Sequence, residues 1–204
     1  MSGCCDNDCA VDALRQRQIG TLQLVLGINA LMFVVILGAA VYGKSTALLA
    51  DCLDNLGDAL TYGLSLLAAY RGARAKARVA LFKGLLILLA ACGVVVQIVY
   101  RLLNPATPVF EVMGGFSLLG LAANSVCLYL LWRHRDEDIN MSSVWECSRN
   151  DIAANVSVFL AAGGVWLTGS GWPDIAVAVC LVLLLLRSAG RVVAAAMAEL
   201  RAIA

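Results

Sequence analysis

The sequence predicts an all-α integral membrane protein, a six-transmembrane-helix bundle whose N and C termini both lie in the cytoplasm. Three observations support this fold class: the composition, the spacing of the apolar stretches, and the placement of the basic residues. The 204 residues are 61% hydrophobic and only 14% charged, whereas charged residues make up about a quarter of a soluble domain. The formal net charge of +1 provides no broad basic surface for nucleic acid.

The first 18 residues are polar and contain few core-forming side chains. We expect residues 1–18 to form a flexible cytoplasmic tail that carries Cys4, Cys5 and Cys9. This segment lacks the basic start of a signal peptide, so we expect the first span to be retained.

The first three spans are expected over residues 19–42, 46–70 and 79–103. Each is long enough to cross a bilayer core, which takes about 20 helical residues. A tight turn at residues 43–45 separates the first two spans, and a basic stretch at residues 71–78 follows the second. The third span ends before residues 104–108, where two prolines are incompatible with a continuing helix.

The last three spans are expected over residues 109–132, 143–168 and 173–198, followed by a short tail, residues 199–204. The fourth span is rich in Gly and Ala, which allow close contacts between membrane helices. Pro173 and Asp174 open the sixth span, because proline at the first helical position and an acid in the first turn are both favourable there.

The basic residues set the expected orientation, since six spans put both termini on one side of the membrane. Only Lys44 and Arg101 lie on the opposite side. The basic residues on the side of the termini are Arg15, Arg17, Arg71, Arg74, Lys76, Arg78, Arg133, Arg135, Arg187, Arg191 and Arg201. The positive-inside rule makes that side cytoplasmic. We expect a multi-pass protein of the bacterial inner membrane.

Asp54 and Asp58 lie inside the second span, which is otherwise apolar. Each carboxylate at the centre of a spanning helix costs about 2.5–3.5 kcal/mol on insertion scales. Together with Asp51 they are spaced i, i+3, i+7, so a helix places all three on one face. A bound cation would compensate their charge.

The fifth span carries a second polar group, which includes Asp151 and Asn155. At 1.5 Å per residue, both this pair and the pair Asp54 and Asp58 lie roughly 12 and 18 Å from their own end of the span. Antiparallel packing of the two helices then sets Asp54 opposite Asn155 and Asp58 opposite Asp151, near the middle of a core about 30 Å thick. Four oxygen-bearing side chains at one depth predict a divalent cation site.

These residues resemble the transmembrane domain of the cation diffusion facilitator family. The resemblance rests on the stretch from Ser45 to Asp51, on Asp54-x-x-x-Asp58, on Asp151-x-x-x-Asn155, and on the later residues Thr168-Gly169 and Trp172-Pro173-Asp174. It implies export of Zn²⁺ or related divalent metals in exchange for protons, with Asp54, Asp58, Asp151 and Asn155 as metal ligands. It also implies a homodimer, here through the membrane domain, because the cytoplasmic C-terminal domain common in the family is missing.

The sequence departs from the family pattern on the fifth span. The family usually has His at the position of Asp151 and Asp at that of Asn155. Its His-rich loop between the fourth and fifth spans is also missing, since His134 is the only histidine. We expect the metal to be the transported substrate. Zn²⁺ is the expected first preference, followed by Co²⁺ and Cd²⁺. We expect no cofactor.

Simpler roles remain open for each site residue. Asp54 and Asp58 can form a protonated interhelical pair, and Asn155 can act as interhelical glue. Asp51 is either a partner of the ligands or a residue of the outer vestibule. Cys147 lies four residues before Asp151 and can line the inner approach. The tail thiols Cys4, Cys5 and Cys9 can capture soft or borderline metals.

Three function classes follow from these residues. The first is a proton-coupled exporter of divalent metal. The second is a passive divalent channel, which the same acidic residues permit. The third is a membrane enzyme or assembly protein with a polar core; no nucleophile and base pair supports an enzyme, so we expect the chain not to be one.

Overall fold

The computed structural model describes residues 4–68, 73–132 and 139–202. Within these ranges the side chains of residues 4–18, 64, 65, 67, 68, 73–76, 79, 83 and 139–149 lie outside the description. The described residues form six helices and no strand. The helices are α1 (Cys4–Tyr42), α2 (Thr46–Ala68), α3 (Ala73–Leu103), α4 (Phe110–Trp132), α5 (Ile139–Thr168) and α6 (Trp172–Ala202). The all-helical, six-helix prediction is confirmed.

The helices follow the expected spans closely except at helix ends on the side of the termini, where α3 begins at Ala73, before the expected residue 79, and α6 ends at Ala202, after the expected residue 198. The backbone of α1 is helical from Cys4, where the sequence predicts a flexible tail before residue 19. Residues 10–17 consist largely of Ala, Leu, Arg and Gln, which have high helix propensity and extend the apolar helix. The helix α5 begins at Ile139, ahead of the expected start at residue 143.

Five helices of the described part are long and apolar enough to cross a membrane: α1 from Ile19, α3 from Ala80, α4, α5 from Asn150, and α6. The helix α2 is not one of them, because Asp51, Asp54 and Asp58 interrupt its apolar sequence. It nevertheless lies inside the bundle, in contact with α1, α3, α5 and α6. The three carboxylates are therefore shielded by other helices.

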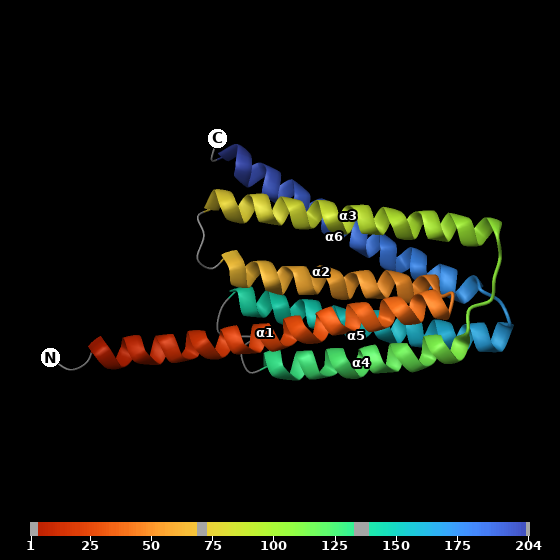
Figure 1. Ribbon diagram of the computed structural model, residues 1–204, viewed down its shortest axis with the longest axis horizontal. Helices are drawn as coiled ribbons and strands as arrows, with labels where there is room; N and C mark the ends of the chain where they lie inside the picture. Colours follow the sequence, from red (N-terminus) through yellow and green to blue (C-terminus); the bar gives the residue numbers. More distant parts are fainter. Residues whose placement is uncertain (1–3, 69–72, 133–138, 203–204) are drawn as a thin grey trace.

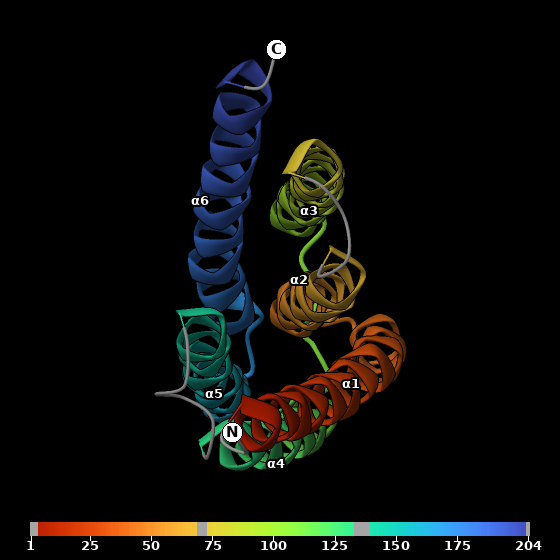
Figure 2. The same cartoon turned by 90° about the vertical axis from the view of Figure 1, so that its left-hand side faces the viewer.

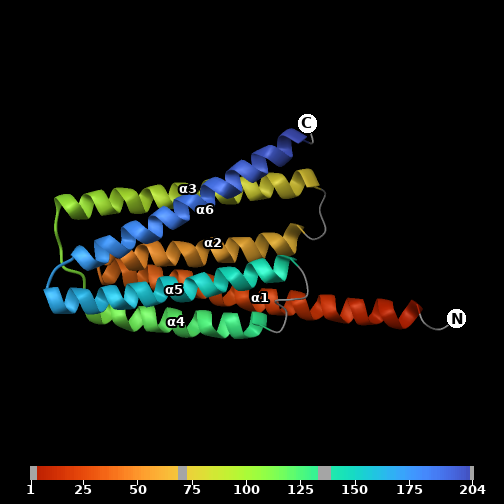
Figure 3. The ribbon, with the colours of Figure 1, turned by 180° about the vertical axis from the view of Figure 1, so that it is seen from behind.

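The six helices run side by side along the long axis, and both termini lie at the same end (Figure 1). We call this the terminal end and the opposite one the far end. Seen from the terminal end, α1, α2, α4 and α5 form one group, and α3 and α6 form a pair beside it (Figure 2). The helix α6 is tilted, so that its C-terminal end diverges from α5 (Figures 1 and 3).

The largest apolar core lies mainly in the far half of the bundle. Its buried members include Ile36, Leu48, Val94, Met113 and Val158, one from each of the first five helices. Many other members are alanines, whose small side chains let helix backbones approach closely. Apolar packing thus dominates the far half, although the buried polar residues Ser45, Thr46, Ser117 and Asp174 also lie there.

Candidate functional site

The N-terminus of α2 is held by a side chain from α6. One Asp174 carboxylate oxygen accepts hydrogen bonds from Ser45 Oγ at 2.6 Å and the Ala47 amide at 3.0 Å, and the other accepts one from the Thr46 amide at 2.8 Å. Ser45 Oγ in turn accepts a hydrogen bond from the Leu48 amide at 3.0 Å, as an N-cap residue does. A carboxylate at a helix N-terminus also interacts favourably with the helix dipole. Asp174 therefore fixes the position of α2 at the far end.

The turn before α2 explains why this cap forms. Lys44 adopts a left-handed conformation with φ of 53°, which closes α1, and the amides of Gly43 and Ser45 donate to the last carbonyls of α1. The chain reverses within three residues, so α2 packs directly against α1. From this anchored start, the next turns of α2 set the depth of its acidic face.

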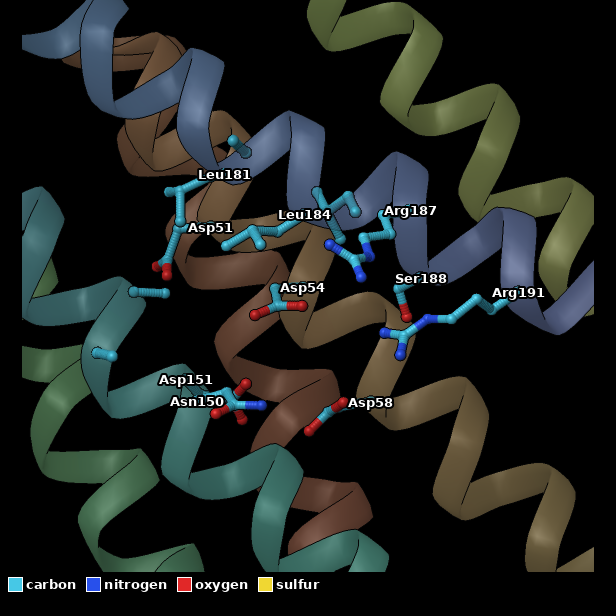
Figure 4. Close-up of a pocket in the computed structure, with 14 residues that line it drawn as sticks. Asp51, Asp54, Asp58, Asn150, Asp151, Leu181, Leu184, Arg187, Ser188 and Arg191 are labelled. Atoms are coloured by element: carbon cyan, nitrogen blue, oxygen red, sulfur yellow. The ribbon is translucent and has the colours of Figure 1, made fainter.

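The acidic face of α2 lines a cavity of about 480 Å³. Asp51, Asp54 and Asp58 all contribute to its wall, as their i, i+3, i+7 spacing predicts. Asp51 is almost fully buried and Asp58 is buried, while Asp54 is partly exposed. The remaining wall comes from α5, at residues 150–154, and from α6, at residues 181–191. Figure 4 shows the three carboxylates arranged along α2 with α5 and α6 around them.

Asp151 on α5 lies opposite this face, as the antiparallel pairing of the second and fifth helices predicts. Its carboxyl group is in side-chain contact with those of both Asp54 and Asp58. The structure therefore brings three carboxyl groups together from two helices. Among the described side chains, no three Asp, Glu, His or Cys groups already converge at metal-ligand distance.

Asn155 is placed differently from the three acids. Its Nδ2 donates to the backbone oxygen of Asp151 at 2.9 Å, and its Oδ1 is buried without a hydrogen-bond partner. The side chain packs on Gly120 of α4, where a Cβ atom would overlap its oxygen. It is not among the residues that line the cavity, so the structure does not place it opposite Asp54 within that space.

Asp51 has one oxygen, Oδ2, that is buried and has no hydrogen-bond partner. Its neighbour one turn on, Asn55, donates from Nδ2 to the Asp51 backbone oxygen at 3.1 Å and leaves the carboxylate free of that contact. A buried polar atom without a partner is costly unless water or an ion satisfies it. This oxygen is thus available to a cation or its hydration shell.

Asp58 also accepts a hydrogen bond from a side chain one turn further along α2. Tyr62 Oη donates to Asp58 Oδ2 at 2.8 Å, and Tyr62 belongs to a small apolar cluster with Val25, Cys127 and Leu131. The fully buried Tyr62 ring thus orients one oxygen of Asp58 from within the group formed by α1, α2 and α4.

Several residues of the site were missed by sequence reasoning. Arg187, Ser188 and Arg191 of α6 line the same cavity as the acids. The sequence signal for the two arginines was their spacing of one turn on an apolar helix. In the sequence they served only to orient the protein by the positive-inside rule. Asp174 was interpreted only as an acid in the first turn of its own helix, because no pattern indicates that it caps a different one.

The accessory cysteines of the prediction lie outside the described side chains. These are Cys4, Cys5, Cys9 and Cys147. Their roles stay predictions.

A family model described as the cation efflux transmembrane domain matches residues 22–201. No curated protein matches the chain. The matched segment spans the membrane helices and all of the residues that line the cavity.

Proposed function

We propose a mechanism of metal export for this chain from the premise that it belongs to the cation efflux family. It is accordingly a multi-pass integral membrane protein and a cation transporter, and the family is one of transporters rather than enzymes. The proposal adds the substrate class, the ligands and the driving force. The chain exports a divalent metal ion from the cytoplasm, with Zn²⁺, Co²⁺ and Cd²⁺ as the favoured substrates, in exchange for protons.

The contact of Asp151 with both Asp54 and Asp58 carries this proposal. Three like-charged groups repel one another when ionised, so they stay together only with protons or a cation between them. Carboxylates must be ionised to bind metal, which makes protons direct competitors of the ion. A cluster that holds either protons or metal can couple their opposite movements.

The metal ligands are Asp54, Asp58 and Asp151, and metal binding draws their carboxylates together. Asn155 is the fourth ligand. Its unpartnered Oδ1 is free to accept a cation, provided that the side chain rotates away from Gly120. The bound ion would then replace the missing hydrogen-bond partner of this buried oxygen.

The cavity extends toward the terminal end of the bundle. It reaches from Asp51 in the second turn of α2 to Arg191 near the terminal end of α6, and residues of the apolar core occupy much of the far half. With the termini in the cytoplasm of a bacterial inner membrane, this is the conformation that loads metal from the cytoplasm. The active form is a homodimer through the membrane helices.

Transport by the full chain in sealed liposomes tests the proposal. Zn²⁺, Co²⁺, Cd²⁺ and Mn²⁺ are offered in turn, with and without a pH gradient, while metal and proton fluxes are recorded together. We expect metal flux in one direction to drive proton flux in the other, and flux to weaken as the pH on the loading side falls. Metal flux that is indifferent to the pH gradient would instead indicate a passive channel.

A further inference from the structure

Arg187 and Arg191 occupy the cavity wall opposite the acids. They are spaced i, i+4 and so share one face of α6. Both line the cavity, and their side chains extend from α6 toward the space in front of Asp54 and Asp58 (Figure 4). A guanidinium group has only donors and stays charged, so neither residue is a metal ligand.

Arg187 lies close to the terminal side of the membrane core. Counted from Trp172 at 1.5 Å per residue, it lies roughly 22 Å along α6, in the last third of a bilayer core about 30 Å thick. A long basic side chain near the end of a membrane helix commonly extends to the membrane surface. Arg187 also lines the cavity that holds the acids, so its positive charge acts on any cation that enters.

The charge of the cavity explains this arrangement. Among the described residues, four carboxylates line it, those of Asp51, Asp54, Asp58 and Asp151, and two guanidinium groups face them. With every group ionised, the formal charge is −2, which one divalent cation neutralises. The same cavity without the arginines would carry −4 and would attract a second ion or hold the first too tightly.

We propose that Arg187 and Arg191 set the charge of the cavity so that it accepts one divalent ion and releases it again. This inference rests on the proposed function and names two specificity-determining residues for the same site. Repulsion between fixed positive charges and an entering cation lowers the affinity, and it acts over several ångströms in a partly hydrated cavity. The two arginines thereby lower the affinity for the ion and speed its release, which raises the transport rate.

Zn²⁺ binding to the purified full chain tests the inference. The double variant R187Q/R191Q should bind the first Zn²⁺ about tenfold more tightly than the wild type, because two fixed positive charges no longer repel the ion. It should also bind a second Zn²⁺ ion and export zinc with a lower maximal rate and a lower KM. The charge-preserving variant R187K/R191K should keep the affinity, the single ion and the rate of the wild type.

The control is Arg201→Gln, which removes a positive charge from the exposed last turn of α6, outside the cavity. It should leave zinc affinity within about twofold of the wild type, because an exposed, distant charge is screened. A misfolded variant loses affinity, whereas the inference requires a gain, so the two effects have opposite signs. Unchanged or weaker zinc binding by R187Q/R191Q, or an equal gain in Arg201→Gln, overturns the inference.

The variant Asp54→Asn separates this inference from the proposed function. If the wild type binds and exports zinc and Asp54→Asn does not, the proposed site stands and the arginine variants test their own role. If Asp54→Asn exports zinc normally, the proposed ligands are wrong. The inference that Arg187 and Arg191 set the charge of the ion site is then wrong as well.

Discussion

Asp174 and Asp54 are aspartates on neighbouring helices of one apolar bundle, and their surroundings are opposite. The carboxylate of Asp174 accepts three hydrogen bonds, from the Ser45 hydroxyl and the amides of Thr46 and Ala47. Asp54 lines a cavity, and the side chain that it contacts belongs to another acid, Asp151. A carboxylate surrounded by hydrogen-bond donors can hold a helix in place. A carboxylate that faces other carboxylates is stable only when a proton or a metal cation lies between them.

The same contrast separates the two ends of α2. At the far end, the Asp174 cap and the alanine-rich core immobilise the helix. One turn further along, the wall of the cavity begins at Ala50 and Asp51. The fixed end gives the acidic face a defined position, and in the proposed function the cavity gives an ion access to that face. The following variants test whether this division of roles is real.

The largest effect is expected from the cavity acids. Asp54→Ala or Asp58→Ala should lower metal transport by roughly 100-fold or more, because each removes a proposed ligand, and loss of a residue that only hydrogen-bonds to a metal ligand already costs up to that factor. Metal uptake by liposomes measures transport, and a melting curve in detergent checks the fold. The melting temperature should not fall, since the span becomes more apolar.

The matched control for these variants is Asp174→Asn, which removes a buried acid that is outside the cavity. It should retain measurable transport. Normal export by Asp54→Ala or Asp58→Ala would contradict the assignment of these residues as ligands.

The second prediction concerns the cap. Asp174→Ala should destabilise the protein by about 3 kcal/mol, because buried amide donors at the start of α2 lose a charged acceptor. For a chain of this length, that corresponds to a melting temperature lower by roughly 6–12 °C. Asp174→Asn, which keeps one acceptor oxygen, should lose less than half as much. Equal stability of Asp174→Ala and the wild type would show that the cap does not secure α2.

The third prediction concerns metal choice. The double variant D151H/N155D should raise Zn²⁺ transport relative to Mn²⁺ and Co²⁺, because imidazole favours Zn²⁺ and oxygen ligands suit harder ions. Competition between the metals in liposomes gives the ratio, and a change of about fivefold is expected for exchanging one ligand type. An unchanged ratio with transport retained would show that α5 does not determine the metal.

The last prediction concerns Tyr62, where a change in KM alone is expected. Tyr62→Phe removes the hydroxyl that donates to Asp58 at 2.8 Å while keeping the buried ring. One hydrogen bond contributes about 0.5–1.5 kcal/mol net, so KM should rise about two- to tenfold with the maximal rate nearly unchanged. Initial rates over a range of metal concentrations separate the two constants. A fall in maximal rate as large as that of Asp58→Ala would make Tyr62 part of the ion site itself.

The sequence by itself determined the helices and the helix face that carries the acids. Long apolar stretches, prolines and basic clusters are local signals, and they located all six helices, most of them within a few residues. Helical spacing likewise placed Asp51, Asp54 and Asp58 on one face, and depth arithmetic brought Asp151 to the same level. These predictions succeeded because membrane helices have a fixed rise per residue and a nearly fixed span.

Only the tertiary structure decided which side chains share a space. The rotation of α5 turns Asp151 toward α2 and leaves Asn155 against Gly120 of α4. The packing of α6 places Arg187 and Arg191 in the wall of the acidic cavity, and the start of α6 places Asp174 at the N-terminus of α2. Helix rotation and tilt follow from packing against all neighbours at once, so no local pattern in the sequence contains them.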